Sequence, residues 1–185
     1  MGKVYHFLVL LRYFIPFKLA TPDSKARAQI GKFFQDLRSN QASKLPIAAA
    51  GFCWGGKWVV EMCADTFKTE DGRGVMDVGY TAHPSQLNVP DDIDNVVLPL
   101  SISACEIDPG FNKKQYETTK DILAAKSAKG KDQGVEHETV WYPGAFHGFA
   151  VRADENDKEE AARGKQAEKQ AVDWFNRWFA AYESR

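Results

Sequence analysis

Short apolar runs, separated by segments with helical spacing, recur along the chain. Residues 45–50, 75–82 and 96–104 are apolar over most of their length, which is typical of strands buried on both faces of a parallel sheet. Residues 135–142 alternate between apolar and polar positions, and this period of two also predicts a strand. Because residues 45–50 are apolar on both faces, we expect them to lie centrally in the sheet.

Helical patterns fill the segments between these runs. Residues 26–37, 54–64 and 112–126 predict helices, and the charge-dense residues 154–163 are expected to form the solvated start of a last helix. Residues 87–95 are rich in aspartate and contain a proline, so they are expected to form a loop. The expected apolar positions are Ile30, Phe33, Phe34 and Leu37 in the first helix and Val172, Phe175, Trp178 and Phe179 in the last.

Strands that alternate with helices indicate an α/β fold, with a parallel sheet flanked by helices on both faces. The 185 residues suit a single domain covering residues 1–185. Residues 1–11 are an apolar first element, expected to be a helix packed on the body. Arg12 ends this run too early for a signal peptide or a membrane span, so no membrane association is expected and the protein is expected to be cytoplasmic.

Composition argues against several classes of function. The formal net charge is −1 and the lysines and arginines are scattered, so no nucleic-acid partner is expected. The three cysteines include no C-x-x-C pair, and no spacing of histidines and carboxylates is typical of a metal site. We therefore expect no disulfide framework, no metal and no other cofactor, and a reducing compartment. A small neutral or anionic substrate fits this composition.

Residues 51–57, GFCWGGK, predict a strand that turns sharply into a helix at a nucleophile. Glycines near Cys53 let strand and helix pass close together, as in the G-x-nucleophile-x-G turn, with cysteine in place of serine. A cysteine at a helix N-terminus is favoured as a thiolate, and the amide of Trp54 is the expected first oxyanion donor. The alternative, a small cysteine buried in the core, does not explain the glycines.

Two further side chains near strand ends suit a base and an acid. His147, which lies between two glycines just after a predicted strand, suits the base that takes the proton of Cys53. Asp108 follows another predicted strand and suits the group that orients the base, although a turn aspartate is the alternative. Glu106 is the rival acid. The order of nucleophile, acid and base along the chain is that of α/β-hydrolases.

The remaining histidines and cysteines have other expected roles. His83 follows a predicted strand, so it either faces the same cleft as a substrate contact or is a structural residue that caps the strand. The spacing of His137 implies no acidic or thiol partner. Cys63 and Cys105 are expected to be buried core thiols.

Several motifs together resemble the dienelactone hydrolase family, especially its fungal members. They are GFCWGGK at 51–57, HPS at 83–85, the strand leading to Asp108, and PGAFHGF at 143–149. The resemblance implies an α/β-hydrolase fold and hydrolysis of lactones or related small esters through a cysteine acyl-enzyme. It also implies that Cys53 is the nucleophile, His147 the base and Asp108 the acid.

The chain departs from that family at its start and near the base. Family members begin with further strands that supply a second oxyanion amide, and with a glutamate and an arginine that contact the thiol and a substrate carboxylate. The residues before Cys53 are too few to contain these parts, so the chain resembles a family member shortened at its N-terminus. Arg152 lies one position after an arginine that can hold a substrate carboxylate. Arg152 and His83 are thus the expected substrate-binding residues.

Two functions are open at this point. The first is a cysteine-dependent hydrolase of lactones or small carboxylic esters, and the alternative is a truncated α/β-hydrolase-like binding protein with weak or no activity. Unless residues 4–11 form a strand beside residues 45–50, one edge of the sheet is open. An open apolar edge favours self-association.

Overall fold

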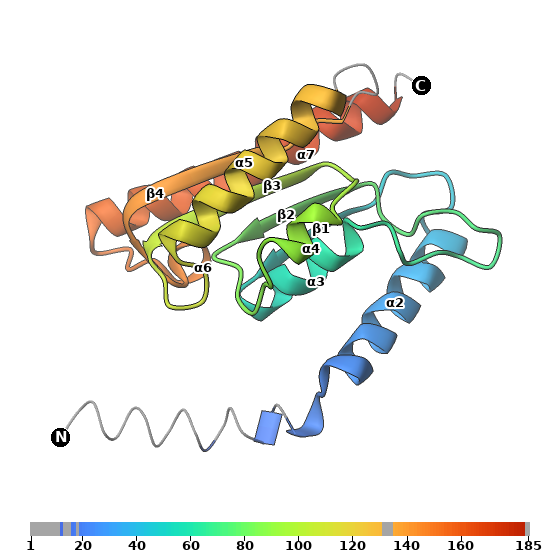
Figure 1. Ribbon diagram of the computed structural model, residues 1–185, viewed down its shortest axis with the longest axis horizontal. Coiled ribbons are helices and arrows are strands. Elements are labelled where there is room, and N and C mark those ends of the chain that lie inside the picture. Colours follow the sequence, from blue (N-terminus) through green and yellow to red (C-terminus); the bar gives the residue numbers. More distant parts are fainter. Residues whose placement is uncertain (1–11, 13–15, 18, 131–134, 184–185) are drawn as a thin grey trace.

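The computed structural model describes residues 12, 16–17, 19–130 and 135–183, and a parallel sheet lies at its centre (Figure 1). The strands are β1 (Ala48–Phe52), β2 (Val78–Ala82), β3 (Leu100–Ile107) and β4 (Glu138–Phe146), and they follow one another across the sheet in this order. Each pair of neighbours is parallel. The predicted α/β class, with a parallel sheet flanked by helices, is therefore confirmed.

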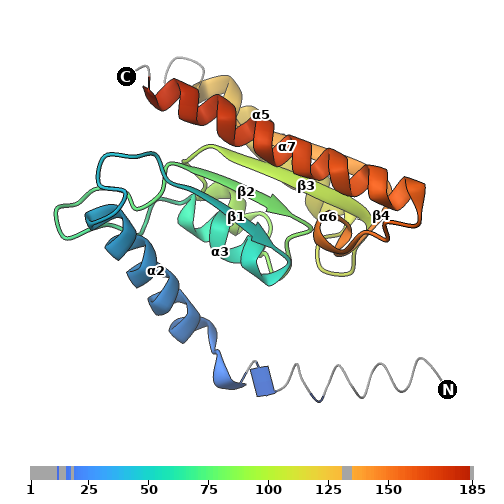
Figure 2. The same ribbon diagram turned by 180° about the vertical axis from the view of Figure 1, so that it is seen from behind.

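Helices cover both faces of the sheet. α3 (Trp54–Met62), the short α4 (Asp91–Asp94) and α5 (Lys113–Gly130) lie on one face, and α7 (Lys158–Glu183) lies across the other (Figures 1 and 2). Every connection adds the next strand in the same direction, and right-handed crossovers then place the connecting helices on one face. α2 (Asp23–Ser39) precedes β1, and α6 (Phe149–Arg152) joins β4 to α7.

Apolar side chains fill the space between the sheet and both helical layers. Beneath α3 and α5, the largest cluster includes the buried side chains of Val60, Ile102 and Leu123. On the other face, Trp174 of α7 packs on β2, and its indole Nε1 donates to the carbonyl oxygen of Gly79 at 2.9 Å. Apolar packing thus fixes the sheet on both faces, so the positions from which the loops after its strands begin are also fixed.

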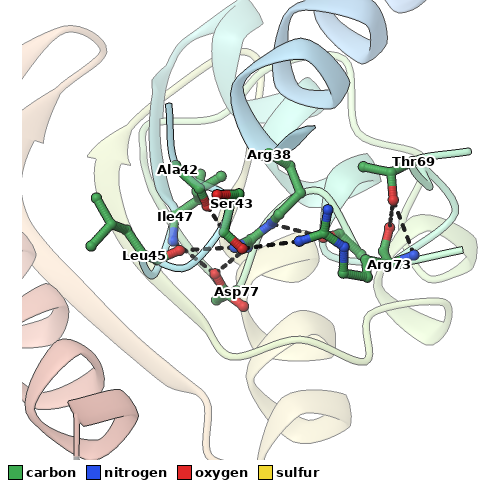
Figure 3. Close-up of polar contacts among 9 residues, drawn as sticks. Arg38, Ala42, Ser43, Leu45, Ile47, Thr69, Arg73 and Asp77 are labelled. Carbon is green, nitrogen blue, oxygen red and sulfur yellow. Dashed lines mark hydrogen bonds and ion pairs between the residues drawn. The ribbon is translucent and has the colours of Figure 1, made fainter. Parts of the chain in front are cut away.

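A buried arginine ties the end of α2 to the start of the sheet (Figure 3). Arg38 is 4% exposed and forms an ion pair with Asp77, which directly precedes β2. Its Nη1 donates to the carbonyl of Leu45 at 2.8 Å, and its Nε donates to that of Gly74 at 3.1 Å. Oδ2 of Asp77 also accepts from the amide of Ile47 at 2.7 Å. These bonds hold together α2 and the segments that enter β1 and β2.

Several elements have other boundaries than predicted. β3 starts at Leu100 rather than at residue 96, since Pro99 has no amide hydrogen for a ladder bond, and it ends at Ile107 rather than at residue 104. β4 continues to Phe146 rather than ending at residue 142. The expected loop at 87–95 contains α4, and α6 was not predicted. Helices of four residues are too short to show a helical period.

Two apolar positions and the place of the first strand also differ from the prediction. Phe33 is 61% exposed because α2 packs on the core through Ile30 and Phe34, and Val172 of α7 is 50% exposed. β1 lies at one edge of the described strands rather than centrally, and Ala50 within it is exposed. The helix expected at residues 1–11, and the strand considered at 4–11, lie outside the described residues.

Candidate active site

The side chains of Cys53, Asp108 and His147 meet at the carboxyl-terminal edge of the sheet. Cys53 lies between β1 and α3, Asp108 follows the last residue of β3, and His147 follows the last residue of β4. Because parallel strands end at the same edge, residues that follow different strands lie close together there. The three positions singled out as nucleophile, acid and base are therefore neighbours in space.

Cys53 occupies a strained turn that depends on two of the nearby glycines. Its φ and ψ are 52° and −119°, a conformation uncommon for a residue with a side chain. A Cβ on Gly51 would lie 2.3 Å from the carbonyl oxygen of Gly55, and a Cβ on Gly56 would lie 2.3 Å from Oγ1 of Thr81. A Cβ on Gly55 would meet no atom of the other described residues within 4 Å, its chain neighbours and the backbone of its own helix aside. Close passage of strand and helix therefore requires Gly51 and Gly56, but not Gly55.

His147 is held by the carboxylate of Asp108. Its Nδ1 lies 3.0 Å from Oδ1 and 3.0 Å from Oδ2 of Asp108, whose side chain is 0% exposed. The amides of Gly110 and Phe111 donate to Oδ1 at 2.7 Å and 3.2 Å. Burial opposes the charged form of Asp108, but the bonds from His147 and Gly110 prevail and lower its pKa. The bond to Asp108 raises the pKa of His147 to about 9 against the opposing effect of burial.

The thiol of Cys53 is surrounded by groups that stabilise a negative charge. Burial opposes ionisation, but hydrogen bonds from His147 and Ser85, the charge of His147 and the amide of Trp54 together lower the pKa of Cys53. The hydroxyl oxygen of Ser85 lies 3.6 Å from Sγ. Together with the raised pKa of His147, these interactions favour a thiolate beside an imidazolium.

The rival acid, Glu106, has a different partner. Its Oε2 accepts a hydrogen bond from the amide of Gly144 at 2.7 Å, and its side chain is exposed. The strand pairing shifts register between Cys105 and Ile107, so the side chains at 106 and 108 do not follow one regular alternation. Of the two acids, only Asp108 contacts His147.

Cys63 and Cys105 are both buried, as expected, but Cys105 also contacts the acid. Its Sγ lies 3.2 Å from Oδ2 of Asp108 and donates to it, and burial together with this carboxylate raises the pKa of Cys105. Burial likewise raises the pKa of Cys63. The sequence indicated neither the contact of Cys105 nor that of Ser85. Only the position of Ser85 in the HPS motif after a strand could have drawn attention to it.

His83 lies beneath His147 rather than at the surface. It is 1% exposed, and its ring centroid is 4.9 Å from that of His147. Neither ring nitrogen has a hydrogen-bond partner within the described part of the chain. Burial and the charge of His147 lower the pKa of His83 to about 4, so the ring is neutral near pH 7. His83 therefore packs against His147 in the interior, and its contact with substrate stays a prediction.

The guanidinium of Arg152 lies close to Gly148, the residue that follows His147. Its amide donates to the carbonyl of Gly148 at 2.9 Å, and a Cβ on Gly148 would lie 2.6 Å from Nη2 of Arg152. The φ of Gly148 is 103°, which favours glycine. No carboxylate of the described residues forms an ion pair with Arg152, whose side chain is exposed. Its guanidinium thus lies next to the loop that carries His147.

The described residues contain neither a cluster of metal ligands nor a membrane-spanning helix. No group of three or more histidine, cysteine, aspartate or glutamate side chains in that part of the chain is arranged to hold a metal ion. Within the same residues, no helix combines the length and the apolar character needed to cross a membrane.

Two curated fungal hydrolases resemble this chain in sequence. Hydrolase tropI of Talaromyces stipitatus is 34% identical over 143 residues, which are 77% of this chain and 50% of that protein. Hydrolase pyvD of Aspergillus violaceofuscus is 33% identical over 132 residues, which are 71% of this chain and 47% of that protein. The chain therefore spans about half the length of the curated relatives it matches.

The fold comparison agrees with the sequence comparison. A solved structure from Klebsiella pneumoniae, described as a dienelactone hydrolase, superposes with a TM-score of 0.61 at 17% identity. The match covers 84% of this chain and 62% of that protein. The model of the dienelactone hydrolase family matches residues 17–179, a range that includes the strands, the Cys53 turn and the loops carrying Asp108 and His147. By this match, the chain belongs to the dienelactone hydrolase family.

Proposed function

We propose that this protein hydrolyses lactones or small carboxylic esters through a Cys53–His147–Asp108 triad and an acyl-enzyme. The observation that carries the proposal is the hydrogen-bonded pair of His147 and Asp108 beside the Cys53 turn, with both nitrogen–oxygen distances at 3.0 Å. A base that is oriented by a buried carboxylate next to a nucleophile is the arrangement that acyl transfer requires. Membership of a family of hydrolases supports the same reading.

In the first half of the reaction, the thiolate of Cys53 attacks the carbonyl carbon of the ester or lactone. The S–C bond forms as the C=O π electrons move to oxygen, and the amide of Trp54, at the start of α3, is proposed to donate a hydrogen bond to that oxygen. When the tetrahedral intermediate collapses, the bond to the alkoxy oxygen breaks. The imidazolium of His147 gives its proton to that oxygen, and a thioester on Cys53 remains.

In the second half, water hydrolyses the thioester. His147, now neutral, takes a proton from water as its oxygen attacks the acyl carbon, and Asp108 stabilises the imidazolium that forms. The S–C bond then breaks, the carboxylic acid departs, and the thiolate of Cys53 is restored. Each proton that His147 gives in the first half is regained in the second.

Two further residues are proposed to contact the substrate. The guanidinium of Arg152 lies beside Gly148 and has no carboxylate partner among the described residues, so it can hold a substrate carboxylate near His147. His83 is buried in this structure, so a contact with substrate would require its ring to become accessible. The proposed substrate is therefore a small lactone or ester with an anionic group.

A binding protein with weak or no activity is the second candidate function. The chain spans about half the length of the curated relatives it matches, and the Trp54 amide is the single oxyanion donor proposed above. An oxyanion site that keeps the Trp54 amide as its single donor would lose on the order of a hundredfold or more in turnover. In both functions Cys53 can react with an ester. They differ in whether the acyl group on Cys53 is then hydrolysed, so that the cycle repeats.

Hydrolysis of p-nitrophenyl acetate by the purified chain tests the proposal. The native chain should release p-nitrophenolate repeatedly, and Cys53→Ala should reduce the rate to that of buffer. Cys63→Ala is the matched control, because that thiol is buried and lies outside the site. One equivalent of product per chain, released without further turnover, would favour the binding protein. Equal rates for the native chain and Cys53→Ala, with both folded, would refute the triad.

We also propose that the protein works in the cytoplasm. Cys53, Cys63 and Cys105 are all free, and a thiol nucleophile persists best in a reducing compartment. Expression of the chain with a fluorescent tag in a fungal cell, followed by microscopy, tests this placement. Fluorescence that is confined to a secretory organelle would refute it.

A further inference from the structure

Ser85 joins the nucleophile turn to the loop that carries the acid. Its amide donates to the carbonyl oxygen of Cys53 at 3.0 Å, and its hydroxyl oxygen lies 3.6 Å from the Cys53 sulfur. On its other side, a Cβ on Gly110 would lie 3.1 Å from the Cβ of Ser85, so these two residues are in close contact. The hydroxyl has no other hydrogen-bond partner in the described part of the chain.

The turn that presents Ser85 is strained at both ends. His83 has a φ of 39° and Gln86 has a φ of 61°, although neither is glycine. Residues held in such conformations persist only where the surrounding structure enforces them, and they concentrate at functional sites. Here the enforced turn places one side chain, that of Ser85, against the reacting sulfur.

We infer that Ser85 is a further catalytic residue, whose hydroxyl donates a hydrogen bond to the Cys53 thiolate before attack and again when the thiolate leaves the acyl group. The inference rests on the proposed function, because it assumes that Cys53 is the nucleophile. A thiolate can only accept hydrogen bonds, so the hydroxyl must be the donor in this pair. The backbone bond between Ser85 and Cys53 keeps the hydroxyl in place.

Ser85 and His147 stabilise the Cys53 thiolate in different ways. When His147 gives its proton to the leaving oxygen, it loses the positive charge beside the sulfur, and that charge returns only when His147 takes a proton from water. Ser85 exchanges no proton and is anchored to Cys53 itself, so its hydrogen bond is present in both halves of the reaction. A hydrogen bond to the thiolate also makes it a better leaving group during deacylation. The pKa of Cys53 is lowered in part by this hydroxyl.

The test is the pH dependence of alkylation of Cys53 by iodoacetamide, read by mass spectrometry, in the native chain and in Ser85→Ala. Alanine keeps the Cβ and the amide of residue 85, so the bond to the Cys53 carbonyl is retained and only the hydroxyl is lost. We expect the variant to react about five to ten times more slowly on the acidic limb. On the alkaline plateau it should react equally fast or slightly faster, because a less stabilised thiolate is more nucleophilic.

Two variants serve as controls. Ser24→Ala removes an exposed hydroxyl on α2 and should match the native profile. Ser85→Thr keeps a hydroxyl, so its rate of alkylation on the acidic limb should equal that of the native chain. If Ser85→Ala folds poorly, the profile of Ser85→Thr is compared with the native profile instead. A Ser85→Ala profile that equals the native one, or one that is slower by the same factor at every pH, overturns the inference and leaves the triad intact. If Cys53 of the native chain itself reacts like an ordinary thiol on the acidic limb, the proposed function fails as well.

Discussion

The backbone of Gly51 passes so close to Gly55 that a Cβ on Gly51 would lie 2.3 Å from the Gly55 carbonyl oxygen. Gly51→Ala should therefore destabilise the fold by about 3 kcal/mol, since strand and helix must separate to admit a methyl group. Gly55→Ala is the matched control. Apart from its chain neighbours and its own helix, no described residue has an atom within 4 Å of the new Cβ, and alanine is the better helix residue, so stability should stay equal or rise by up to about 1 kcal/mol. Urea unfolding midpoints decide the comparison.

Replacement of the acid should separate Asp108 from Glu106. Asp108→Asn should lower kcat/KM by a factor on the order of 10³ to 10⁴, because an amide no longer holds His147 in the required tautomer or stabilises its charge. Glu106→Gln should have little effect, since Glu106 accepts a bond from Gly144 and does not reach His147. Circular dichroism should show both variants folded. A greater loss in Glu106→Gln would contradict the assignment of the acid.

Activity should have a bell-shaped dependence on pH. The pKa of Cys53 is lowered, so kcat/KM should rise on the acidic side as the thiolate forms. The pKa of His147 is raised to about 9, so the alkaline limb should fall near that pH as the imidazolium loses its proton. The stabilisation that follows from the raised pKa of His147 is complete below about pH 6.5 and is lost as the pH rises through about 9.

Hydrolysis rates from pH 5 to 10.5, with urea unfolding at pH 7 and pH 10, measure both effects. The native chain should be less stable at the higher pH, and Asp108→Asn should move the alkaline limb of activity to lower pH. A flat profile through pH 10 would show that His147 carries no proton that matters for the reaction.

The ion pair between buried Arg38 and partly exposed Asp77, at the other end of the sheet, should matter for stability and not for the chemistry. Arg38→Met should lower the free energy of unfolding by about 3 kcal/mol, because it removes the cation that pairs with Asp77 and the Arg38 donors to the carbonyls of Leu45 and Gly74. Lys32→Met is the control, since its pair with Asp36 is exposed and should be worth less than about 1 kcal/mol. Unfolding curves that coincide for the two variants would show that the Arg38 pair is not a stabilising contact.

Much of the site was predictable because it depends on sequence order and on the direction of the strands. Once strands alternate with helices, parallel pairing brings the residues that follow them to one edge, so Cys53, Asp108 and His147 were expected as neighbours. The turn at Cys53 was predictable from its glycines. The sequence does not show which of these glycines is needed. A Cβ on Gly51 would face backbone, whereas a Cβ on Gly55 would face no other described residue, and only the folded structure shows this difference.

Contacts that depend on local irregularity could not be predicted. The bond between Cys105 and Asp108 arises where the pairing of β3 shifts register, and no sequence pattern marks that shift. The contact of Ser85 with Cys53 depends on two non-glycine residues with positive φ. The burial of His83 against His147 goes with ring contacts to Phe52, the last residue of β1, and Phe149, the first residue of α6. Hydrophobic spacing finds elements, whereas these contacts depend on how the ends of the elements meet.

The outer edge of β1 leads to the last prediction. Among the described strands β1 pairs with β2 alone, its residues 48–52 read AAAGF without charge or proline, and Ala50 is exposed. Such an edge lacks the features that deter pairing with another chain, so we propose that the protein self-associates as its concentration rises. Light scattering over a concentration series should show this. Ala50→Lys should shift the series toward monomer without loss of fold, and Ala162→Lys on α7 is a control away from that edge.

Fusion of a family member's N-terminal strands to the chain tests the same edge together with the chemistry. If β1 pairs with an added strand and the oxyanion site gains a second donor, the fusion should be monomeric, and hydrolysis should be faster by on the order of a hundredfold. The fusion should carry Cys53→Ala in parallel, because activity supplied by the added segment alone would survive that change. A native chain that stays monomeric throughout the series and hydrolyses as fast as the fusion would show that β1 needs no further strand for folding or for catalysis.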